Sequence, residues 1–558
     1  MAKKYKGRQI FMESLMAEGV PYIFGNPGTT ENPLLDSLLD YPKIEYIMAL
    51  HEGVAVGMAN YYAQASGITG VANLHVGPGL GNGLGMLYNA YEGHTPLVLT
   101  AGGQDTRMRL RDPLLGHDLV AMAEPLTKWS VQPNSADELP LIMHRAFKIA
   151  KEPPSGPVFV SLPINVMEQE TDNEPMPPTR MFTSPPPDPE GVKAAAELLA
   201  HSKNPVIFCG DGVAHANAVD ELVALAEAVG APCYYEGLHH HVCFPTHHPS
   251  CRDRLPADYS SIRKGMEGAD TVLLVGGNFF EELWFDEGLP FSESTAVIHI
   301  EVAPQMLSRN FSANLGLLGD PKATLAALRD AVDATADDNF RTAVQQRNGG
   351  LAEWKSNDLA SQEKRSKELW DNEPIAPSRL MAEIKAAMPK NAIIVNESIT
   401  ATTDLKRTIP FAERGSYYGT RGGGIGQALP GGIGAKLAHP DRPVIALSGD
   451  GSSMYSIQSL WTAVHHQVPL VYIILHNRTY RVLKLNMNIY RKRWGLAGER
   501  PYPHMDLTKP EFGFVDIARG YGMEAKQIAH PGELGDALKT ALDSGKPYLL
   551  DVLTDGAV

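Results

Sequence analysis

Cysteine is scarce in this chain, and its scarcity excludes a protein held together by disulfides. Four cysteines in a chain of 558 residues are too few for a disulfide framework. We therefore expect a reduced, cytoplasmic compartment. The four are Cys209, Cys233, Cys243 and Cys251.

Long apolar runs and an excess of positive charge are also missing. No run reaches the roughly 18 residues that a membrane helix needs, and the N-terminal stretch Met1–Lys6 lacks the apolar core of a signal peptide. The formal net charge of −15 disfavours nucleic acid and membranes as partners. A hydrophobic content of 43% with 20% charged residues is that of an ordinary globular enzyme.

Two breaks in composition divide the chain, whose length predicts more than one domain. Prolines crowd residues 175–189, which predicts an extended linker. The polar and charged stretch 337–372 predicts a surface crossover that is helical in part. The expected domains are residues 1–180, 190–335 and 370–558.

Within each segment, short apolar runs rich in β-branched residues alternate with helical patterns of about 10 to 15 residues. Continuous apolar strands indicate sheets that helices cover on both faces. We therefore predict an α/β protein of three open α/β domains with mostly parallel sheets. Strands are expected at Pro157–Leu162, Pro205–Cys209, Thr271–Val275, Ala392–Val395, Pro443–Ser448 and Leu470–Leu475.

Polar side chains end the last two of these strands. Asp450 follows one and Asn477 the other, and the carboxyl ends of parallel strands form the ligand-binding edge of an open sheet. A carboxylate and an amide oxygen, with the backbone carbonyl of Thr479, suit Mg²⁺ or Ca²⁺ rather than zinc. Ser452 is expected to open a helix, Tyr455–His465, whose first amides receive phosphate oxygens. An Asp-Gly pair alone would equally mark a simple turn.

Further motifs follow one another along the chain. They are Phe24–Thr29, Ala49–Glu52, Asn73–Asn82, Phe244–Pro249, Asn396–Ser398 and Gly422–Gly426. Together with Gly449-Asp450-Gly451, this series resembles the thiamine diphosphate (ThDP) enzymes, closest to the benzoylformate decarboxylases. The resemblance covers nearly the whole chain and implies pyrimidine-binding, middle and diphosphate-binding domains, in that order.

The resemblance implies ThDP with Mg²⁺ (or Ca²⁺) as cofactors, and nothing in the chain indicates FAD. It places Asp450, Asn477 and Thr479 at the metal, and Ile425 where a bulky side chain holds the cofactor bent. The cofactor-binding residues that it implies are Asn82, Asn396, Ser398, Thr400, Gly424, Ile425, Gly449, Gly451, Ser452 and Tyr480.

Three residues are candidates for catalysis. The resemblance places Glu52 beside the cofactor's aminopyrimidine, where a buried carboxylate assists the proton transfer that activates the cofactor. It makes His75 an acid–base group that faces the substrate. Thr29 stands where benzoylformate decarboxylase has a serine, and its hydroxyl suits a substrate carboxylate. For Glu52 the alternative is a solvated glutamate that offsets the dipole at a helix start. For His75 it is a packed, hydrogen-bonded side chain without a catalytic role.

The chain also departs from the decarboxylase pattern, and the departures concern the substrate. Leu283 replaces a second active-site histidine, so protonation or product release must rest on another group, for which His75, Glu282 and water are the candidates. Val482 and Asn486 replace a smaller and an aromatic residue of the substrate pocket, and Ile399 replaces a threonine near the diphosphate.

The stretch from Cys233 to Cys251 is rich in histidine and cysteine. It suggests zinc, but its spacing fits no finger pattern. One histidine among residues 239–241 or 247–248 is a candidate to replace the histidine lost at Leu283.

Two enzyme functions fit these residues. The first is a ThDP- and Mg²⁺-dependent non-oxidative decarboxylase that converts a benzoylformate-like 2-oxo acid to an aldehyde and CO₂. The alternative is a carboligase or lyase that resembles acetolactate synthase or 2-hydroxyacyl-CoA lyase. A third reading, a cofactor-binding protein without turnover, is disfavoured by the intact Glu52, Asp450 and Asn477. The resemblance further implies a homodimer or homotetramer with active sites at subunit interfaces.

Overall fold

The computed structural model describes residues 4–252, 258–496, 498 and 500–558, so the first three residues of the N-terminal stretch considered above lie outside it. The chain divides into two compact units. Unit 1 comprises residues 1–181, 371–402 and 420–558, and unit 2 comprises residues 182–370 and 403–419. In the described part of the chain, no helix is both long and apolar enough to span a bilayer.

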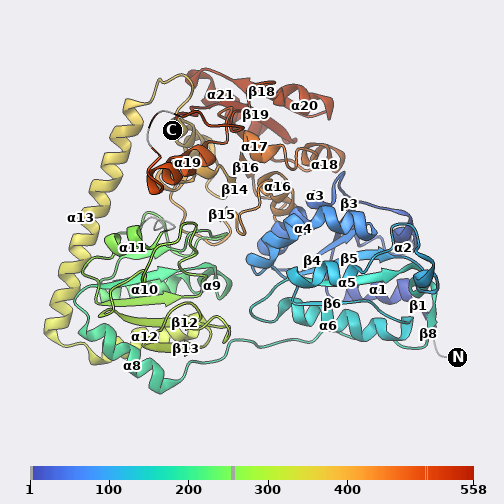
Figure 1. The fold of residues 1–558 in the computed structure, drawn as a ribbon, viewed down its shortest axis with the longest axis horizontal. Helices are drawn as coiled ribbons and strands as arrows, with labels where there is room; N and C mark the ends of the chain where they lie inside the picture. Colours follow the sequence, from blue (N-terminus) through green and yellow to red (C-terminus); the bar gives the residue numbers. More distant parts are fainter. Residues whose placement is uncertain (1–3, 253–257, 497, 499) are drawn as a thin grey trace. The chain divides into compact units, whose positions relative to one another are not determined.

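Unit 1 contains a sheet with the strand order β3-β2-β4-β5-β7-β6, in which every neighbouring pair is parallel (Figure 1). Strands β4, β5 and β7 are buried along their whole length, because helices cover both faces. The strands are β2 (Tyr22–Gly25), β3 (Glu45–Met48), β4 (Gly70–Leu74), β5 (Leu97–Gly103), β6 (Trp129–Val131) and β7 (Val158–Pro163). The helices are α1 (Gly7–Ala17), α2 (Asn32–Ser37), α3 (Glu52–Ser66), α4 (Val76–Glu92), α5 (Leu119–Ala123), α6 (Leu139–Lys151) and α7 (Ile164–Glu168).

A second parallel sheet of unit 1 carries the motifs of the C-terminal segment. Its strands β14, β16, β17, β19 and β18 lie side by side in this order. They span Ile393–Glu397, Val444–Gly449, Val471–His476, Tyr548–Leu553 and Glu524–Ile528. The accompanying helices are α14 (Pro377–Ala387), α16 (Ala428–Ala438), α17 (Asp450–Ser453), α18 (Ser459–His465), α19 (Arg481–Arg493), α20 (Phe514–Gly520) and α21 (Leu534–Asp543). The predicted strands are confirmed to within two residues.

Helix α3 of the first sheet packs directly against helix α16 of the second. Glycines make the contact possible, because added Cβ atoms would collide with the opposite helix. A Cβ at Gly57 would lie 2.7 Å from Cγ of Pro430, and one at Gly431 would lie 2.8 Å from the ring of Tyr61. At Gly434 it would overlap the backbone of α3. The two helices therefore touch nearly backbone to backbone.

Unit 2 contains one parallel sheet with the order β10-β9-β11-β12-β13. Its strands are Cys233–Tyr235, Pro205–Cys209, Thr271–Val275, Ala296–Glu301 and Leu315–Leu318 in that order, which confirms the two strands predicted here. The predicted proline-rich linker has no helix or strand between β8 (Glu170–Thr171) and α8 (Pro189–His201). The other helices are α9 (Asp211–His215), α10 (Val219–Val229), α11 (Tyr259–Gly265), α12 (Pro321–Thr335), α13 (Asp338–Glu368) and α15 (Thr402–Thr408), all but the first residue of which belongs to unit 2.

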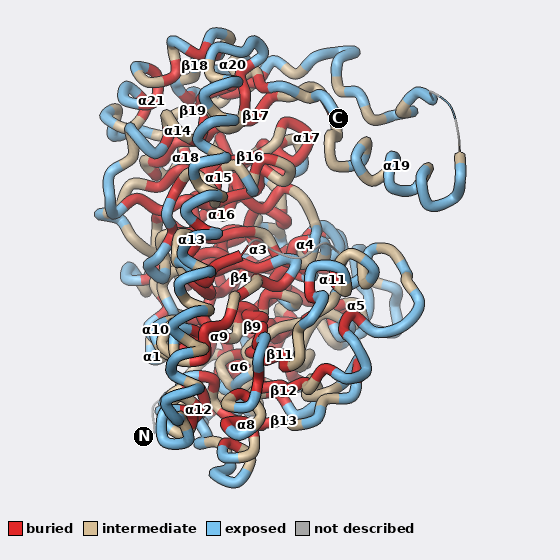
Figure 2. The backbone as a smooth tube through the Cα atoms, turned by 90° about the vertical axis from the view of Figure 1, so that its left-hand side faces the viewer, coloured by how far each residue is buried: buried red, intermediate tan, exposed pale blue. Residues whose placement is uncertain are grey.

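Helix α13 occupies almost the whole polar crossover that the sequence predicted to be helical only in part. Only Lys355 of its 31 residues is buried, and Figure 2 shows the helix mainly in the exposed colour. Arg347 and Asn348 of this helix donate to the carbonyl oxygens of Val229 and Glu227 at the end of α10 (2.8 and 2.9 Å). Hydrogen bonds from polar side chains therefore attach this helix, which has no apolar stripe.

Replacing Gly349 and Gly350 by alanine is expected to stabilise unit 2. Both are exposed inside α13, and an added Cβ would meet nothing within 4 Å. Each change should add about 1 kcal/mol to the free energy of unfolding, the difference in helix propensity between glycine and alanine. Urea unfolding of the double variant checks this. Gly268→Ala is the matched control, since its Cβ is equally free but its φ of +84° predicts a loss of about 1 kcal/mol.

Candidate functional site

The ends of three neighbouring strands bring the C-terminal motifs together. β14, β16 and β17 run parallel, with Glu397 opposite Ser448 and Gly449 opposite Leu475. Ser398, Asp450 and Asn477 follow at one edge of the sheet, within two residues of their strands' ends. The juxtaposition predicted from the sequence is therefore present in the fold.

Asp450 is a buried carboxylate at the first position of α17. Its Oδ1 accepts the N–H of Gly451 at 2.7 Å and its Oδ2 accepts the N–H of Arg478 at 2.5 Å. Burial raises the pKa of Asp450, and these hydrogen bonds oppose the rise only in part. The two hydrogen bonds fix the side chain, and each carboxylate oxygen keeps a lone pair that can bind a metal ion.

The turn from Asn477 to Thr479 faces the same edge. Oδ1 of Asn477 accepts the N–H of Thr479 at 3.0 Å, and Arg478 between them has a left-handed φ of 61°. Nε of Arg478 donates to Oε1 of Glu511 at 2.6 Å, which helps to hold a conformation that favours glycine. One carboxylate with neutral oxygen donors is a set that fits a hard cation.

Across the described ranges, no group of three or more His, Cys, Asp or Glu side chains could hold a metal ion. The set at Asp450 is of a different kind, because it combines one carboxylate with two neutral oxygen donors. Behind the turn, buried His476 places Nδ1 2.9 Å from Oδ1 of buried Asp551, a pair that the sequence did not reveal.

The predicted helix Tyr455–His465 is wrong in extent. The structure has the four-residue helix α17 and then α18 from Ser459. The Ser453 hydroxyl donates back to the carbonyl of Gly449 at 2.8 Å, a local bond that competes with helix continuation. Ser452 lies buried in α17, so phosphate oxygens would meet a short turn rather than a long helix.

Tyr480 requires a glycine at position 451, because an added Cβ there would collide with the tyrosine ring. Tyr480 is held by its N–H, which donates to the carbonyl of Met505 at 2.9 Å. Gly449, Gly451 and Tyr480 thus lie at one place on the sheet edge.

Hydrogen bonds order the segment after β14. Oδ1 of Asn396 accepts from the N–H and the hydroxyl of Ser398 (3.1 and 2.6 Å). Thr400 lies half-buried in the 3₁₀ turn η5 (Ile399–Ala401) that follows. Ile399 there has a φ of 47°, a costly conformation for a β-branched residue.

The glycine loop 422–426 is anchored from two sides. Buried Glu397 accepts the N–H groups of Gly426 and Ala428 (2.7 and 2.9 Å), and burial raises its pKa to about 7. Asn89 of α4 exchanges two hydrogen bonds with Gly424 (3.0 and 3.2 Å). Ile425 between these anchors is half-buried. Glu397 and Asn89 are positioning residues that the motifs alone did not identify.

Glu52 begins α3 and is 6% exposed. Its Oε1 accepts from the amide of Asn26 at 3.2 Å and its Oε2 from the amide of Asn82 at 3.0 Å. A Cβ at Gly79 would lie 2.9 Å from Oε1 of Glu52 and 3.2 Å from Cβ of His75. The first turn of α4 thus approaches both predicted catalytic residues, and this approach requires glycine.

A buried carboxylate missed from the sequence orients His75. Nδ1 of His75 lies 2.9 Å from Oε2 of Glu31, whose side chain is fully buried. Oε1 of Glu31 accepts the N–H of Gly102 and the hydroxyl of Thr30, both at 2.9 Å. Thr29 is exposed beside this pair in the 3₁₀ turn η1 (Thr29–Glu31). The only sequence signal was a glutamate two residues from Thr29.

The predicted substrate residues do not all come from one element. Val482 and Asn486 lie one turn apart on α19, and both are half-buried, so they share a face. Leu283 belongs to unit 2, where it is 60% exposed. Segment 104–118 adds two strongly exposed apolar side chains, Leu110 and Leu114, which no sequence motif indicated.

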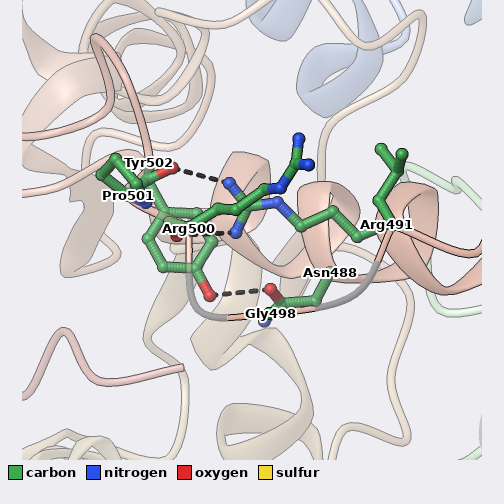
Figure 3. A pocket seen from close by; sticks show the side chains of 7 residues that line it. Asn488, Arg491, Gly498, Arg500, Pro501 and Tyr502 are labelled. Atoms are coloured by element: carbon green, nitrogen blue, oxygen red, sulfur yellow. Dashed lines mark hydrogen bonds between the residues drawn. The ribbon is translucent and has the colours of Figure 1, made fainter.

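A pocket lies beside the C-terminal half of α19 (Figure 3). Nη1 and Nη2 of Arg491 donate to the carbonyl oxygens of Arg500 and Pro501 at 2.9 and 2.6 Å. The hydroxyl of Tyr502 donates to Oδ1 of Asn488 at 2.7 Å. The arginine therefore fastens a loop to the helix, and this pocket contains none of the predicted site residues. Its lining is Asn488, Arg491, Leu496, Gly498, Arg500, Pro501 and Tyr502.

The histidine triplet 239–241 and the four cysteines of unit 2 are buried. His239, His240 and His241 are at most 6% exposed, and burial lowers the pKa of His241 to about 4. All four cysteines are buried as free thiols. Burial of residues 239–241 disfavours them as proton donors to a substrate.

Three sequence profiles of thiamine pyrophosphate (the same compound as ThDP) enzymes match the chain. They are the N-terminal TPP binding domain at residues 5–122, the central domain at residues 192–328 and the C-terminal TPP binding domain at residues 400–552.

Individual relatives resemble the chain over nearly its whole length. Benzoylformate decarboxylase of Pseudomonas aeruginosa is 35% identical over 549 residues, 97% of each chain. A protein named "Probable acetolactate synthase large subunit" from Methanocaldococcus jannaschii is 30% identical over 99% of this chain and 92% of its own. The solved structure of the ThDP-dependent 4-hydroxybenzoylformate decarboxylase of Rhodococcus jostii RHA1 matches with a TM-score of 0.84 at 30% identity, over 99% of both chains.

Proposed function

Since the chain belongs to the family of thiamine pyrophosphate enzymes, we propose that it is a ThDP- and Mg²⁺-dependent decarboxylase of a benzoylformate-like 2-oxo acid. The products would be an aldehyde and CO₂. The observation that carries the proposal is the pair of His75 and Glu31 beside Glu52, at the edge of the first sheet. It supplies an acid–base group next to the carboxylate that the family uses on its cofactor.

The residues at the edge of the second sheet fit the cofactor's metal and diphosphate. Asp450, Asn477 and Thr479 would hold Mg²⁺ (or Ca²⁺), and the backbone of Gly451 would lie next to the phosphate oxygens. When bound, ThDP supplies an electron sink for the carbon that loses CO₂. The other expected contacts come from Asn396, Ser398, Thr400, Gly424, Ile425, Gly449, Ser452 and Tyr480.

The side chains at the edge of the first sheet would move and hold protons. Glu52, fixed by the amides of Asn26 and Asn82, would share a proton with the cofactor's ring nitrogen. His75 would deliver a proton to the carbonyl oxygen of the substrate, and Thr29 would donate to its carboxylate. Leu283, Val482 and Asn486 would shape the pocket for the substrate's side chain.

We further propose the domain limits 1–180, 190–335 and 370–558, with self-association as a homodimer or homotetramer. By these limits Glu52 and Asp450 would belong to different domains, and both lie in unit 1. In the family that the chain resembles, active sites form where such domains of two subunits meet. Light scattering on the purified protein tests this, and an active monomer would contradict it.

A substrate screen tests the proposed reaction. Aryl, branched and straight-chain 2-oxo acids are supplied with ThDP and Mg²⁺, and CO₂ and aldehyde are measured. We expect both products from an aryl acid and loss of activity with EDTA. The absence of turnover on every 2-oxo acid would overturn the proposal.

A carboligase is the second candidate, and Leu283 favours it. Leucine donates no proton at the position of the missing histidine, and slow protonation gives an aldehyde or ketone time to accept the carbon nucleophile instead. The identity to acetolactate synthase over nearly the whole chain points the same way. Addition of an aldehyde to the screen distinguishes the two, because a hydroxyketone as main product favours the carboligase.

A Glu31→Gln variant is expected to lower kcat about 10- to 100-fold, the loss typical when a partner that orients an essential histidine is removed. The amide keeps the shape but not the charge beside Nδ1 of His75. The pH profile of kcat should shift as well, which a purely structural defect would not cause. Glu45→Gln, at a side chain that is 60% exposed, is the control, and equal activity of both variants would contradict the role of Glu31.

A further inference from the structure

The proposed decarboxylation consumes a proton at the carbon that loses CO₂, and the donor of this proton has not been assigned. Leu283 has none to give, and His239–His241 are buried in unit 2. Nε2 of His247 is buried as well, and Nε2 of His248 lies 3.2 Å from Oε1 of Glu227. His75 is oriented by Glu31 and is assigned to the carbonyl oxygen. A second donor should be titratable, exposed and located at the sheet edge that carries Glu52 and His75.

His117 meets these requirements. β4 and β5 are parallel neighbours, His75 follows β4, and His117 lies on the segment that follows β5. A Cβ added at Gly77 in the first turn of α4 would lie 3.7 Å from Cβ of His117, which is van der Waals contact. The exposed His117 thus stands over the turn that begins next to His75.

The backbone on both sides of His117 is fixed. The carbonyl oxygen of Leu115 would lie 3.6 Å from the same added Cβ. Asp118 caps α5 by accepting the N–H of Ala121 at 3.0 Å. The imidazole is therefore carried by a segment docked on α4 at two points.

The other histidines of the first sheet are unsuited. Nδ1 of His51 accepts the N–H of Gly53 at 3.0 Å as the cap of α3. Nδ1 of His144, on α6, is buried. His94 follows the far end of α4, whose 17 residues span about 25 Å at 1.5 Å per residue. Among the described residues of this sheet and its helices, His117 is the exposed histidine on the same side as Glu52.

We propose that His117 is the second acid–base residue of the site, an inference that rests on the proposed decarboxylase function. The bond between the carbonyl carbon and the carboxylate breaks, CO₂ leaves, and the electron pair stays on that carbon. A C–H bond forms there as the imidazolium N–H breaks, and its electron pair remains on nitrogen. Solvent then restores the proton, so one 2-oxo acid anion and one proton give one aldehyde and CO₂.

The first test compares His117→Ala with His530→Ala, a control at a side chain that is 65% exposed. We expect His117→Ala to release aldehyde about 100-fold more slowly while its first-turnover CO₂ burst persists. With an aldehyde acceptor present, its products should move toward hydroxyketone. An unchanged rate, pH profile and product ratio would overturn the role of His117 and leave the proposed function standing. Absence of decarboxylation by the unmodified enzyme would overturn the proposed function itself.

A second test needs no turnover. The NMR signal of His117 is the ¹⁵N-histidine signal that disappears in His117→Ala. In the ThDP- and Mg²⁺-loaded protein, this signal should shift on addition of an aryl phosphonate, an unreactive analogue of an aryl 2-oxo acid. A signal that does not move at a saturating analogue concentration would contradict the proposal.

Discussion

A Glu52→Gln variant is expected to lose about 10²- to 10⁴-fold in kcat, the range for removal of an acid–base group. The amides of Asn26 and Asn82 donate to both oxygens of Glu52, and glutamine offers only one oxygen to them. More importantly, the amide of glutamine cannot exchange a proton with a cofactor nitrogen near neutral pH. Steady-state kinetics at saturating ThDP and Mg²⁺ measure the effect.

The matched control for this change is Glu124→Gln, at an exposed glutamate near the same sheet. It should retain the full kcat. Binding of ThDP to Glu52→Gln, followed by calorimetry, should weaken far less than kcat, since the metal and diphosphate contacts are untouched. A fully active Glu52→Gln variant would show that the chemistry differs from that of the family.

An Asp450→Asn variant is expected to bind Mg²⁺ and ThDP about 100-fold more weakly, or not at all. The change removes the only carboxylate from the proposed metal set, and loss even of a residue behind the ligands typically costs 10- to 100-fold. Titration of ThDP at fixed Mg²⁺, and of Mg²⁺ at fixed ThDP, measures both affinities. Asp543→Asn on α21 serves as control, and unchanged affinities in Asp450→Asn would remove Asp450 from the metal site.

The stability of the protein without cofactor is expected to depend on pH through Asp450. Burial raises the pKa of Asp450 in the folded state, so this contribution is fully present below the unfolded-state pKa and is lost as the pH rises through the folded-state pKa. Thermal unfolding without metal should therefore show a Tm that falls with rising pH, and the fall should be smaller in Asp450→Asn. Saturating Mg²⁺ and ThDP should raise the Tm of the unmodified protein more than that of the variant.

The sequence predicted those features that depend on local pattern. Continuous apolar runs located the strands, and the polar residues after two of them located Asp450 and Asn477 at one edge, because parallel strands bring their ends together. The sequence did not predict the roles of Glu31 and Glu397. Their partners, His75 and Gly426, are distant in sequence, so the contacts exist only once the chain has folded.

Local pattern gave a wrong helix start where a side chain hydrogen-bonds to the backbone. The helix expected from Tyr455 starts only at Ser459, after a serine bond that closes the preceding turn. The sequence predicted too short a helix at α13. This helix lacks the apolar stripe by which helices are recognised in a sequence.

The close packing of α3 on α16 has a consequence for how this enzyme can diversify. Gly57, Gly431 and Gly434 leave no space for larger side chains, so substitutions there would displace the helix that carries Glu52. Segment 104–118 and α19 carry exposed or half-buried side chains instead. Selection for new substrates should therefore accumulate changes in these two segments outside His117, and a library confined to them that keeps His117 should yield altered specificity without loss of cofactor activation.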